Sequence, residues 1–152
     1  MATVMKGKPA GAAGGFGLRV LALLLGVFFV FNGVDKFAWF TDSSILAGRL
    51  TGWLEGAAPG TRWYIETVAM PGVPLFARLV PLGEFSIGAA LILGFWTRLV
   101  ACLALLMVVN FHFARGFFYE WEFLRDGTGF PVLGGLIVLA LTGARLPFSV
   151  SK

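Results

Sequence analysis

Four stretches of apolar residues run through this chain, and polar segments that hold most of its charged residues separate them. The stretches cover approximately residues 16–37, 75–96, 99–118 and 130–144. At ~1.5 Å per residue, a helix of ~20 residues crosses a ~30 Å hydrocarbon layer. The pattern therefore predicts an all-α fold, namely an integral membrane four-helix bundle.

The fourth stretch is the shortest, with about fifteen apolar residues from Phe130 to Ala144. A spanning helix usually needs ~17–25 residues. Pro131 suits a first helical turn, and residues 127–129 or local thinning of the bilayer can supply the missing length. We favour four crossings, because an odd number would place Arg98 and Arg145 on opposite faces of the membrane.

Two features near the second stretch constrain its geometry. The turn at residues 95–98 is so short that the second and third helices must be antiparallel neighbours. Pro81 lies inside the second stretch and lacks a backbone N–H, so we expect a kink or a late helix start there.

The connection from Ala38 to Pro74 is long for a membrane hairpin. Five apolar residues in it recur at helical spacing: Ile45, Leu46, Leu50, Trp53 and Leu54. This spacing predicts a short helix that lies on the membrane surface, is capped by Asp42 or Ser43 and is ended by Pro59-Gly60. Residues 70–74 are expected to break the chain again before the second span.

The N-terminal segment resembles the charged region of a signal peptide, but no small-residue cleavage site follows the first apolar stretch. We expect residues 1–15 to be a flexible tail and the first stretch to be a retained helix. The membrane domain would then cover residues 16–146.

Composition supports a membrane protein: 58% of the residues are hydrophobic and only 13% are charged. The net charge of +4 comes from Lys and Arg scattered singly along the chain, which argues against nucleic-acid binding. These cations suit the orientation of a chain in a lipid bilayer. One cysteine excludes dithiol chemistry within the chain, and one histidine without a partner ligand argues against a metal.

The charges divide between two sides of the predicted bundle. One side has no acidic residue and carries Lys6, Lys8, Arg19, Arg98, Arg145 and Lys152. The acids gather on the other side, which has an equal number of Lys and Arg. Charge per loop length favours cytoplasmic termini in a bacterial or archaeal-type cytoplasmic membrane.

Depth in the membrane gives the candidate site. Asn32 lies thirteen residues after Arg19, Glu84 fourteen before Arg98, and His112 fourteen after Arg98. All three are therefore ~20 Å from the arginine side and share one layer. A carboxylate inside a membrane is costly, so Glu84 is the first place to look for function.

Several cations lie at or just outside this layer, namely Lys36, Arg78 and Arg115. A Glu–His or Glu–Lys pair in low dielectric changes protonation readily, which suits a quinone headgroup or a proton relay. The alternative is structural: Asn32, Glu84 and one cation hydrogen-bond across helices and fix their packing.

Four of the five tryptophans flank the acid-rich side: Trp39, Trp53, Trp63 and Trp121. An interfacial aromatic belt explains most of them. So dense an aromatic layer could also shield a quinone or receive a partner subunit.

Several motifs resemble those of the DoxX/DoxD family. In the first span they are Arg19, Gly26, Phe29, Gly33, Lys36 and Phe37. In and after the second span they are residues 79–84, Gly88, Leu91, residues 93–94 and residues 97–98. Residues 125–131 resemble the family's approach to its last helix.

The resemblance implies a four-helix membrane domain, and in the namesake members a small subunit of a thiosulfate:quinone oxidoreductase. At most, the chain would then be one subunit of a quinone-dependent oxidoreductase, with a non-covalent quinone and with neither metal nor flavin. Its partners would be the lipid bilayer and other membrane or redox subunits. The alternative is a non-catalytic accessory subunit of a larger respiratory or photosynthetic electron-transfer complex.

Overall fold

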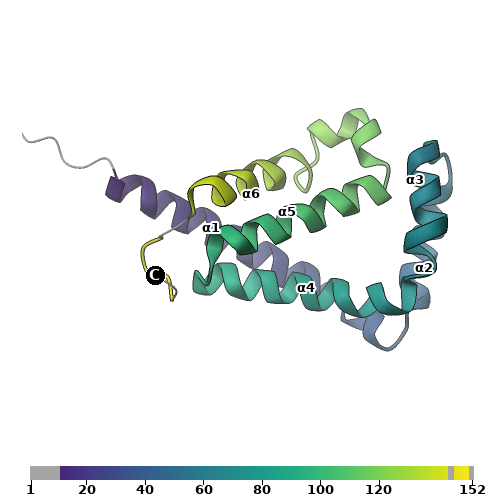
Figure 1. The fold of residues 1–152 in the computed structure, drawn as a ribbon, viewed down its shortest axis with the longest axis horizontal. Coiled ribbons are helices and arrows are strands. Elements are labelled where there is room, and N and C mark those ends of the chain that lie inside the picture. Colours follow the sequence, from purple (N-terminus) through teal and green to yellow (C-terminus); the bar gives the residue numbers. More distant parts are fainter. Residues whose placement is uncertain (1–10, 144–145, 151–152) are drawn as a thin grey trace, which may run out of the picture.

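The computed structural model describes residues 11–143 and 146–150, and every regular element among them is helical. Four helices form the bundle: α1 (Gly11–Asp35), α4 (Val73–Leu93), α5 (Thr97–Ala114) and α6 (Phe130–Thr142). Figure 1 shows the four helices running lengthwise through the molecule. This arrangement confirms the predicted all-α membrane bundle.

Three helices are long and apolar enough to cross a membrane: Gly14–Asp35 of α1, α4 and α5. The chain is thus a multi-pass integral membrane protein. Helix α6 is also apolar but has 13 residues, so it is only ~20 Å long. That α6 crosses the membrane stays a prediction, and so does the location of the termini on the cytoplasmic side.

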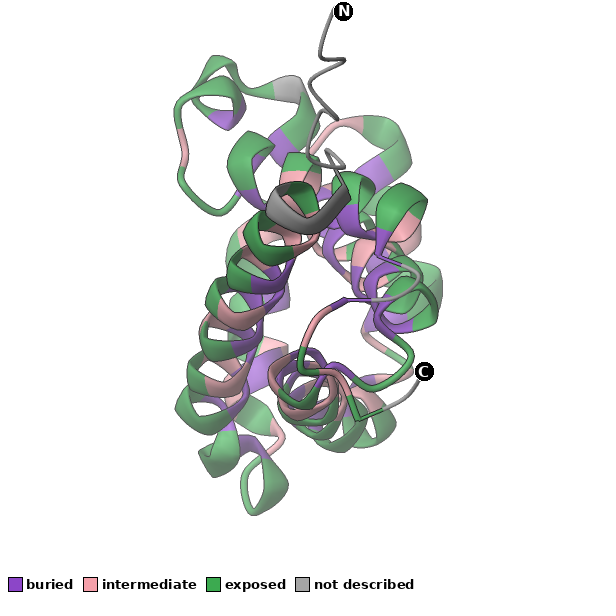
Figure 2. Cartoon of the chain, turned by 90° about the vertical axis from the view of Figure 1, so that its left-hand side faces the viewer, coloured by how far each residue is buried: buried purple, intermediate pink, exposed green. Residues whose placement is uncertain are grey.

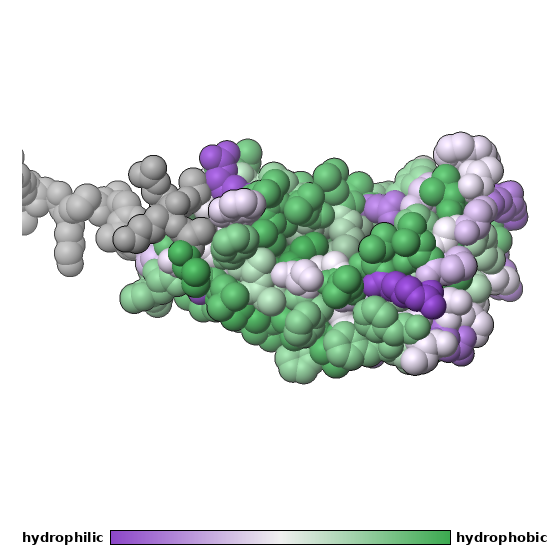
Figure 3. Space-filling view, turned by 60° about the horizontal axis from the view of Figure 1, so that its bottom comes forward, coloured by the Kyte–Doolittle hydropathy of each residue, from purple (hydrophilic) through white to green (hydrophobic). Residues whose placement is uncertain are grey.

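The outward faces of the helices are apolar, as a bilayer requires. Leu24, Leu106 and Leu141 are each more than 60% exposed. Figure 3 shows apolar side chains over the middle of the molecule and hydrophilic side chains concentrated at one end. Lipid chains would therefore contact the middle of the bundle, and headgroups or water its polar end.

The core lies where the four helices face one another (Figure 2), and small residues bring α1 and α4 closest. A Cβ atom added to Gly88 would lie 2.6 Å from the Gly26 carbonyl oxygen. One added to Gly33 would lie 2.9 Å from the Pro81 carbonyl oxygen. The two backbones are thus in direct contact, which is how small residues pack membrane helices.

The expected late helix start at Pro81 is wrong. Helix α4 begins at Val73, with Pro74 in its first turn, and continues through Pro81 to Leu93. Membrane helices tolerate an internal proline because neighbouring groups compensate for the lost hydrogen bond. The predicted short turn to α5 is confirmed; Gly94 ends α4 with a left-handed backbone at φ +70°.

The long connection after α1 folds into a helical cap over one end of the bundle. It contains η1 (Phe37–Phe40), α2 (Ser44–Leu54), α3 (Pro59–Tyr64) and the π-helix η2 (Ile65–Ala69). Helix α2 confirms the predicted short helix, but Pro59 and Gly60 begin α3 instead of ending α2, because proline fits the first helical turn.

The cap has a small core of its own. Its buried apolar residues are Trp39, Leu46, Leu50, Ile65 and Ala69, and they cluster with Val73 and Ala77 at the start of α4. The N-cap Ser43 makes no capping bond with its side chain; instead Asp42 accepts a hydrogen bond of 2.9 Å from the Ser44 backbone N–H. The connection is therefore a packed structure that closes the acid-rich end of the bundle.

The third span is shorter than expected, since α5 ends at Ala114 and not near residue 118. Gly116 adopts a left-handed backbone at φ +73° and turns the chain away. Two short 3-10 helices follow, η3 (Phe117–Tyr119) and η4 (Trp121–Leu124). They lead back to α6 beside α5 (Figure 1).

Candidate functional site

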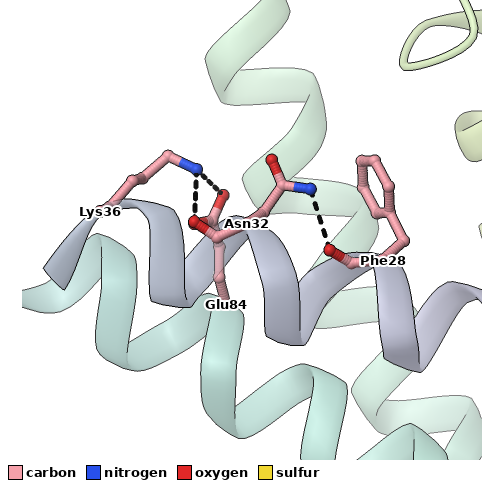
Figure 4. A network of polar contacts seen from close by, with 4 residues as sticks. All are labelled: Phe28, Asn32, Lys36 and Glu84. Atoms are coloured by element: carbon pink, nitrogen blue, oxygen red, sulfur yellow. Dashed lines mark hydrogen bonds and ion pairs between the residues drawn. The ribbon is translucent and has the colours of Figure 1, made fainter.

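A buried ion pair joins α1 to α4 near the cap. The Lys36 Nζ atom lies 2.7 Å from Oε2 and 3.0 Å from Oε1 of Glu84 (Figure 4). Only 9% of Lys36 and 4% of Glu84 is exposed. Lys36 follows Gly33 by three residues, and Glu84 precedes Gly88 by four. At these spacings each charged residue lies on the same helix face as its glycine, and these are the faces at which α1 and α4 are in contact.

Asn32 completes this polar cluster from one turn earlier on α1. Its backbone carbonyl accepts a third hydrogen bond from Lys36 Nζ, at 3.0 Å. Its side-chain amide donates to the Phe28 carbonyl oxygen at 2.9 Å. Lys36, Glu84 and Asn32, which the sequence placed in or next to one layer, are thus in contact.

These residues face a cavity of about 310 Å³ between the bundle and the cap. Its lining combines aromatic and aliphatic side chains with a few polar ones. The predicted site residues that line it are Asn32, Lys36, Glu84, His112 and Arg115. Among the cap residues that line it are Trp39, Arg49, Trp53 and Tyr64.

Arg49 and Tyr64 are site residues that the sequence did not identify. The Arg49 guanidinium lies over the buried Trp39 ring, 5.1 Å from its centre. The Tyr64 hydroxyl donates a 2.6 Å hydrogen bond to the Asn110 side-chain oxygen and so ties the cap to α5. The sequence pattern places Arg49 outside the apolar stripe of α2, but it does not indicate which part of the molecule the Arg49 side chain contacts.

His112 lines the cavity without pairing with Glu84. It is 6% exposed, and its Nε2 atom donates to the Thr128 carbonyl oxygen at 3.1 Å. Phe117, Phe118 and Phe123 surround the ring. Among the described residues, the ionic partner of Glu84 is therefore Lys36, and the hypothesised Glu–His pair does not form.

A turn outside the spans holds the Thr128 carbonyl in place. The Asp126 carboxylate accepts hydrogen bonds from the hydroxyl and the backbone N–H of Thr128. These two bonds, from the side chain first and then from the backbone, lower the pKa of Asp126. The loop before α6 is thus shaped to present an acceptor to His112.

Two of the predicted membrane-face arginines cap helix ends. Arg19 is buried and donates to the carbonyl oxygens of Leu91 and Ile92, in the last turn of α4. Arg98 Nε donates to the Ala140 carbonyl oxygen, in the last turn of α6. Cations at helix C-termini complement the helix dipole, and both lie at the end of the bundle away from the cap.

The remaining predicted arginines have local roles or lie beyond the described residues. Arg78 donates to the Pro74 carbonyl oxygen one turn earlier in α4. Arg115 lies over the Phe117 ring, 4.4 Å from its centre. Arg145, with Lys6, Lys8 and Lys152, lies outside the residues that the structure describes. Within that described part, no three His, Cys, Asp or Glu side chains gather into a potential metal site.

A bundle of membrane helices with a polar, cap-covered cavity defines this protein as a small multi-pass membrane protein with an internal cavity. The chain belongs to the DoxX family, whose sequence profile matches residues 17–115. This match confirms the resemblance found in the sequence. It runs from α1 to the residue after α5 and includes Lys36, Glu84 and His112.

The chain is also similar to the inner membrane protein YqjF of Escherichia coli (strain K12). The two are 36% identical over 102 residues, which is 63% of this chain and 70% of YqjF. No solved structure matches the chain.

Proposed function

We propose that this protein is a membrane subunit of a quinone-linked redox system and that its cavity holds the quinone headgroup. The observation that carries the proposal is the buried Lys36–Glu84 pair on the wall of a cavity of about 310 Å³. An ion pair this deep in a membrane protein is a candidate functional group by default.

The size and chemistry of the cavity suit such a ligand. Small-molecule sites commonly have volumes of ~300–1,000 Å³, apolar walls and a few placed polar groups. Here Phe28, Phe29 and Trp39 supply aromatic wall, and Asn32 and Glu84 supply polar atoms. Quinones dissolve in the bilayer that surrounds α1, α4 and α5, so the ligand would come from the lipid phase.

A quinone takes up protons together with electrons, and the site offers groups that exchange protons. Glu84 and Lys36 form a buried ion pair, and His112 lines the same cavity. The single cysteine makes sulfur chemistry on this chain alone a poor fit. We therefore assign the electron donor's site to a partner chain, in a thiosulfate:quinone oxidoreductase-like arrangement.

The first test is to extract the native protein gently and to measure quinone per protein chain by mass spectrometry. We expect bound quinone in the wild type and its loss in Glu84→Gln, because the amide replaces a carboxylate of the cavity wall. The matched control is Glu66→Gln, since Glu66 is exposed and its ion-pair partner among the described residues is the exposed Arg62, at 3.6 Å. The control should retain its quinone.

One outcome would favour the second hypothesis, a non-catalytic accessory subunit. Trp63 and Trp121 are 62% and 76% exposed beyond the ends of the spans, where a partner subunit can contact them. Migration with a large cofactor-bearing assembly, without quinone bound to this chain, would favour that role and contradict the first proposal.

A further inference from the structure

The hydrogen-bonding capacity of the cavity wall is uneven, and we infer that its inner end recognises the reduced, hydroxyl-bearing form of the ligand over the oxidised form. The inference rests on the proposed quinone site. It names the redox state that the site retains: a quinol donates hydrogen bonds through two O–H groups, whereas a quinone only accepts them.

Most of the donors at the inner end are in use, including all those of the charged group. An ammonium group has three N–H bonds, and Lys36 directs them to the two Glu84 oxygens and to the Asn32 carbonyl. One amide N–H of Asn32 is bonded to the Phe28 carbonyl. The Nε2–H of His112 is bonded to the Thr128 carbonyl. Among the described side chains at this end, the second amide N–H of Asn32 and the indole N–H of the buried Trp39 are left to donate.

Acceptors at the inner end, by contrast, have capacity to spare. A carboxylate offers about four acceptor positions, and Lys36 fills two of those on Glu84. The Asn32 side-chain oxygen points away from the α1 backbone (Figure 4) and accepts no hydrogen bond from a described residue. In its neutral form the His112 ring keeps a lone pair on Nδ1, because the proton that bonds Thr128 is on Nε2.

The cationic donors that remain available lie at the outer rim. Arg49 and Arg115 are exposed residues that line the cavity. Their guanidinium groups lie over the rings of Trp39 and Phe117, and within the described chain neither has a carboxylate at ion-pair distance. The cavity is thus polarised: acceptors are buried at its inner end and cationic donors surround its mouth.

This polarity decides between the two ligand forms. A quinone carbonyl at the inner end can accept only from neutral N–H groups and gives nothing to the buried acceptors there, which stay unsatisfied at a cost. A quinol hydroxyl would donate to Glu84, Asn32 or His112, and a hydrogen bond to a charged acceptor is among the stronger ones. The outer oxygen of either form can accept from the rim arginines.

The test compares three probes of nearly equal shape against the purified wild-type protein: decylubiquinol, decylubiquinone and the dimethyl ether of decylubiquinol. Binding can be followed by tryptophan fluorescence, because Trp39 and Trp53 line the cavity. We expect the quinol to bind about tenfold tighter than the quinone, as one retained charge-assisted hydrogen bond implies. The ether has no O–H, so it should bind no better than the quinone.

A variant extends the test without disturbing the ion pair. Asn32→Leu removes one inner acceptor together with one spare N–H donor, so it should weaken both forms, while the preference for the quinol, which the Glu84 carboxylate maintains, should persist. Equal binding of quinol and quinone by the wild type, or tighter binding of the quinone, would overturn the inference and leave the proposed quinone site standing. Failure of both forms to bind would overturn the proposed function itself.

Discussion

Two cations are buried against α4 towards opposite ends of α1, Arg19 in its first half and Lys36 one residue after its last, but their partners differ. Arg19 is 7% exposed and donates to backbone carbonyls in the last turn of α4. Lys36 is 9% exposed and pairs with the side chain of Glu84 in the middle of α4. Arg19 thus uses acceptors that the α4 backbone supplies at its C-terminus, whereas the acceptor for Lys36 is a buried side-chain carboxylate.

The difference separates a structural contact from a candidate site. The carbonyls that Arg19 binds are left over at any helix C-terminus, so the arginine satisfies groups that would otherwise need water or lipid headgroups. A buried ion pair is rarely more stable than two apolar residues in its place. Only the second end borders the cavity, so function is the better explanation for its ion pair.

The largest predicted effect comes from breaking the Lys36–Glu84 pair on one side. Glu84→Leu leaves an ammonium group without its carboxylate in a buried position. We expect a loss of ~3–5 kcal/mol in the free energy of unfolding. Thermal unfolding in detergent, followed by circular dichroism, would measure it.

The matched control is the double variant Lys36→Met/Glu84→Leu. It removes both charges, so most of the stability should return, while quinone binding should not. If the double variant were as unstable as Glu84→Leu alone, the loss would come from packing, and the contrast with the Arg19 end would fail.

A smaller effect is expected from the helix contact that lies between the two ends. In Gly88→Val, the new side chain would meet the Gly26 carbonyl and the Val30 backbone, each 2.6 Å from the added Cβ atom. Overpacking of this kind typically costs ~1–3 kcal/mol. Gly134→Val in α6 is the control, because an added Cβ there meets nothing within 4 Å. Equal unfolding temperatures for both variants would contradict the close α1–α4 contact.

The sequence predicted the spans well, because a bilayer imposes length and hydropathy on every crossing segment. Helix ends were less predictable, as at Ala114, where the left-handed Gly116 ends α5 early. Within the cap, the sequence predicts α2 but not α3. It favours a helix end at Pro59-Gly60, although proline is equally suited to a helix start.

Depth predicted more of the site than any motif did, since Asn32, Glu84 and His112 all line one cavity. The pairing within that layer was not predictable. Whether Glu84 meets Lys36 or His112 depends on the order of helices around the bundle, and periodicity does not encode that order. Arg49 and Tyr64 reach the cavity only because the cap folds back over it, a long-range contact without a local sequence signal.

The smallest predicted effect tests the structural end of α1. Arg19→Met removes both hydrogen bonds to the α4 carbonyls and keeps an unbranched side chain in the core. We expect a loss of ~1–2 kcal/mol, because the freed carbonyls lie at a helix end and can turn towards headgroups or water. Quinone content per chain should stay at the wild-type level, since Arg19 is not part of the cavity wall. Unfolding temperature and quinone content measured on one preparation separate the two roles: a loss of quinone with unchanged stability would mean that the arginine end, too, communicates with the cavity.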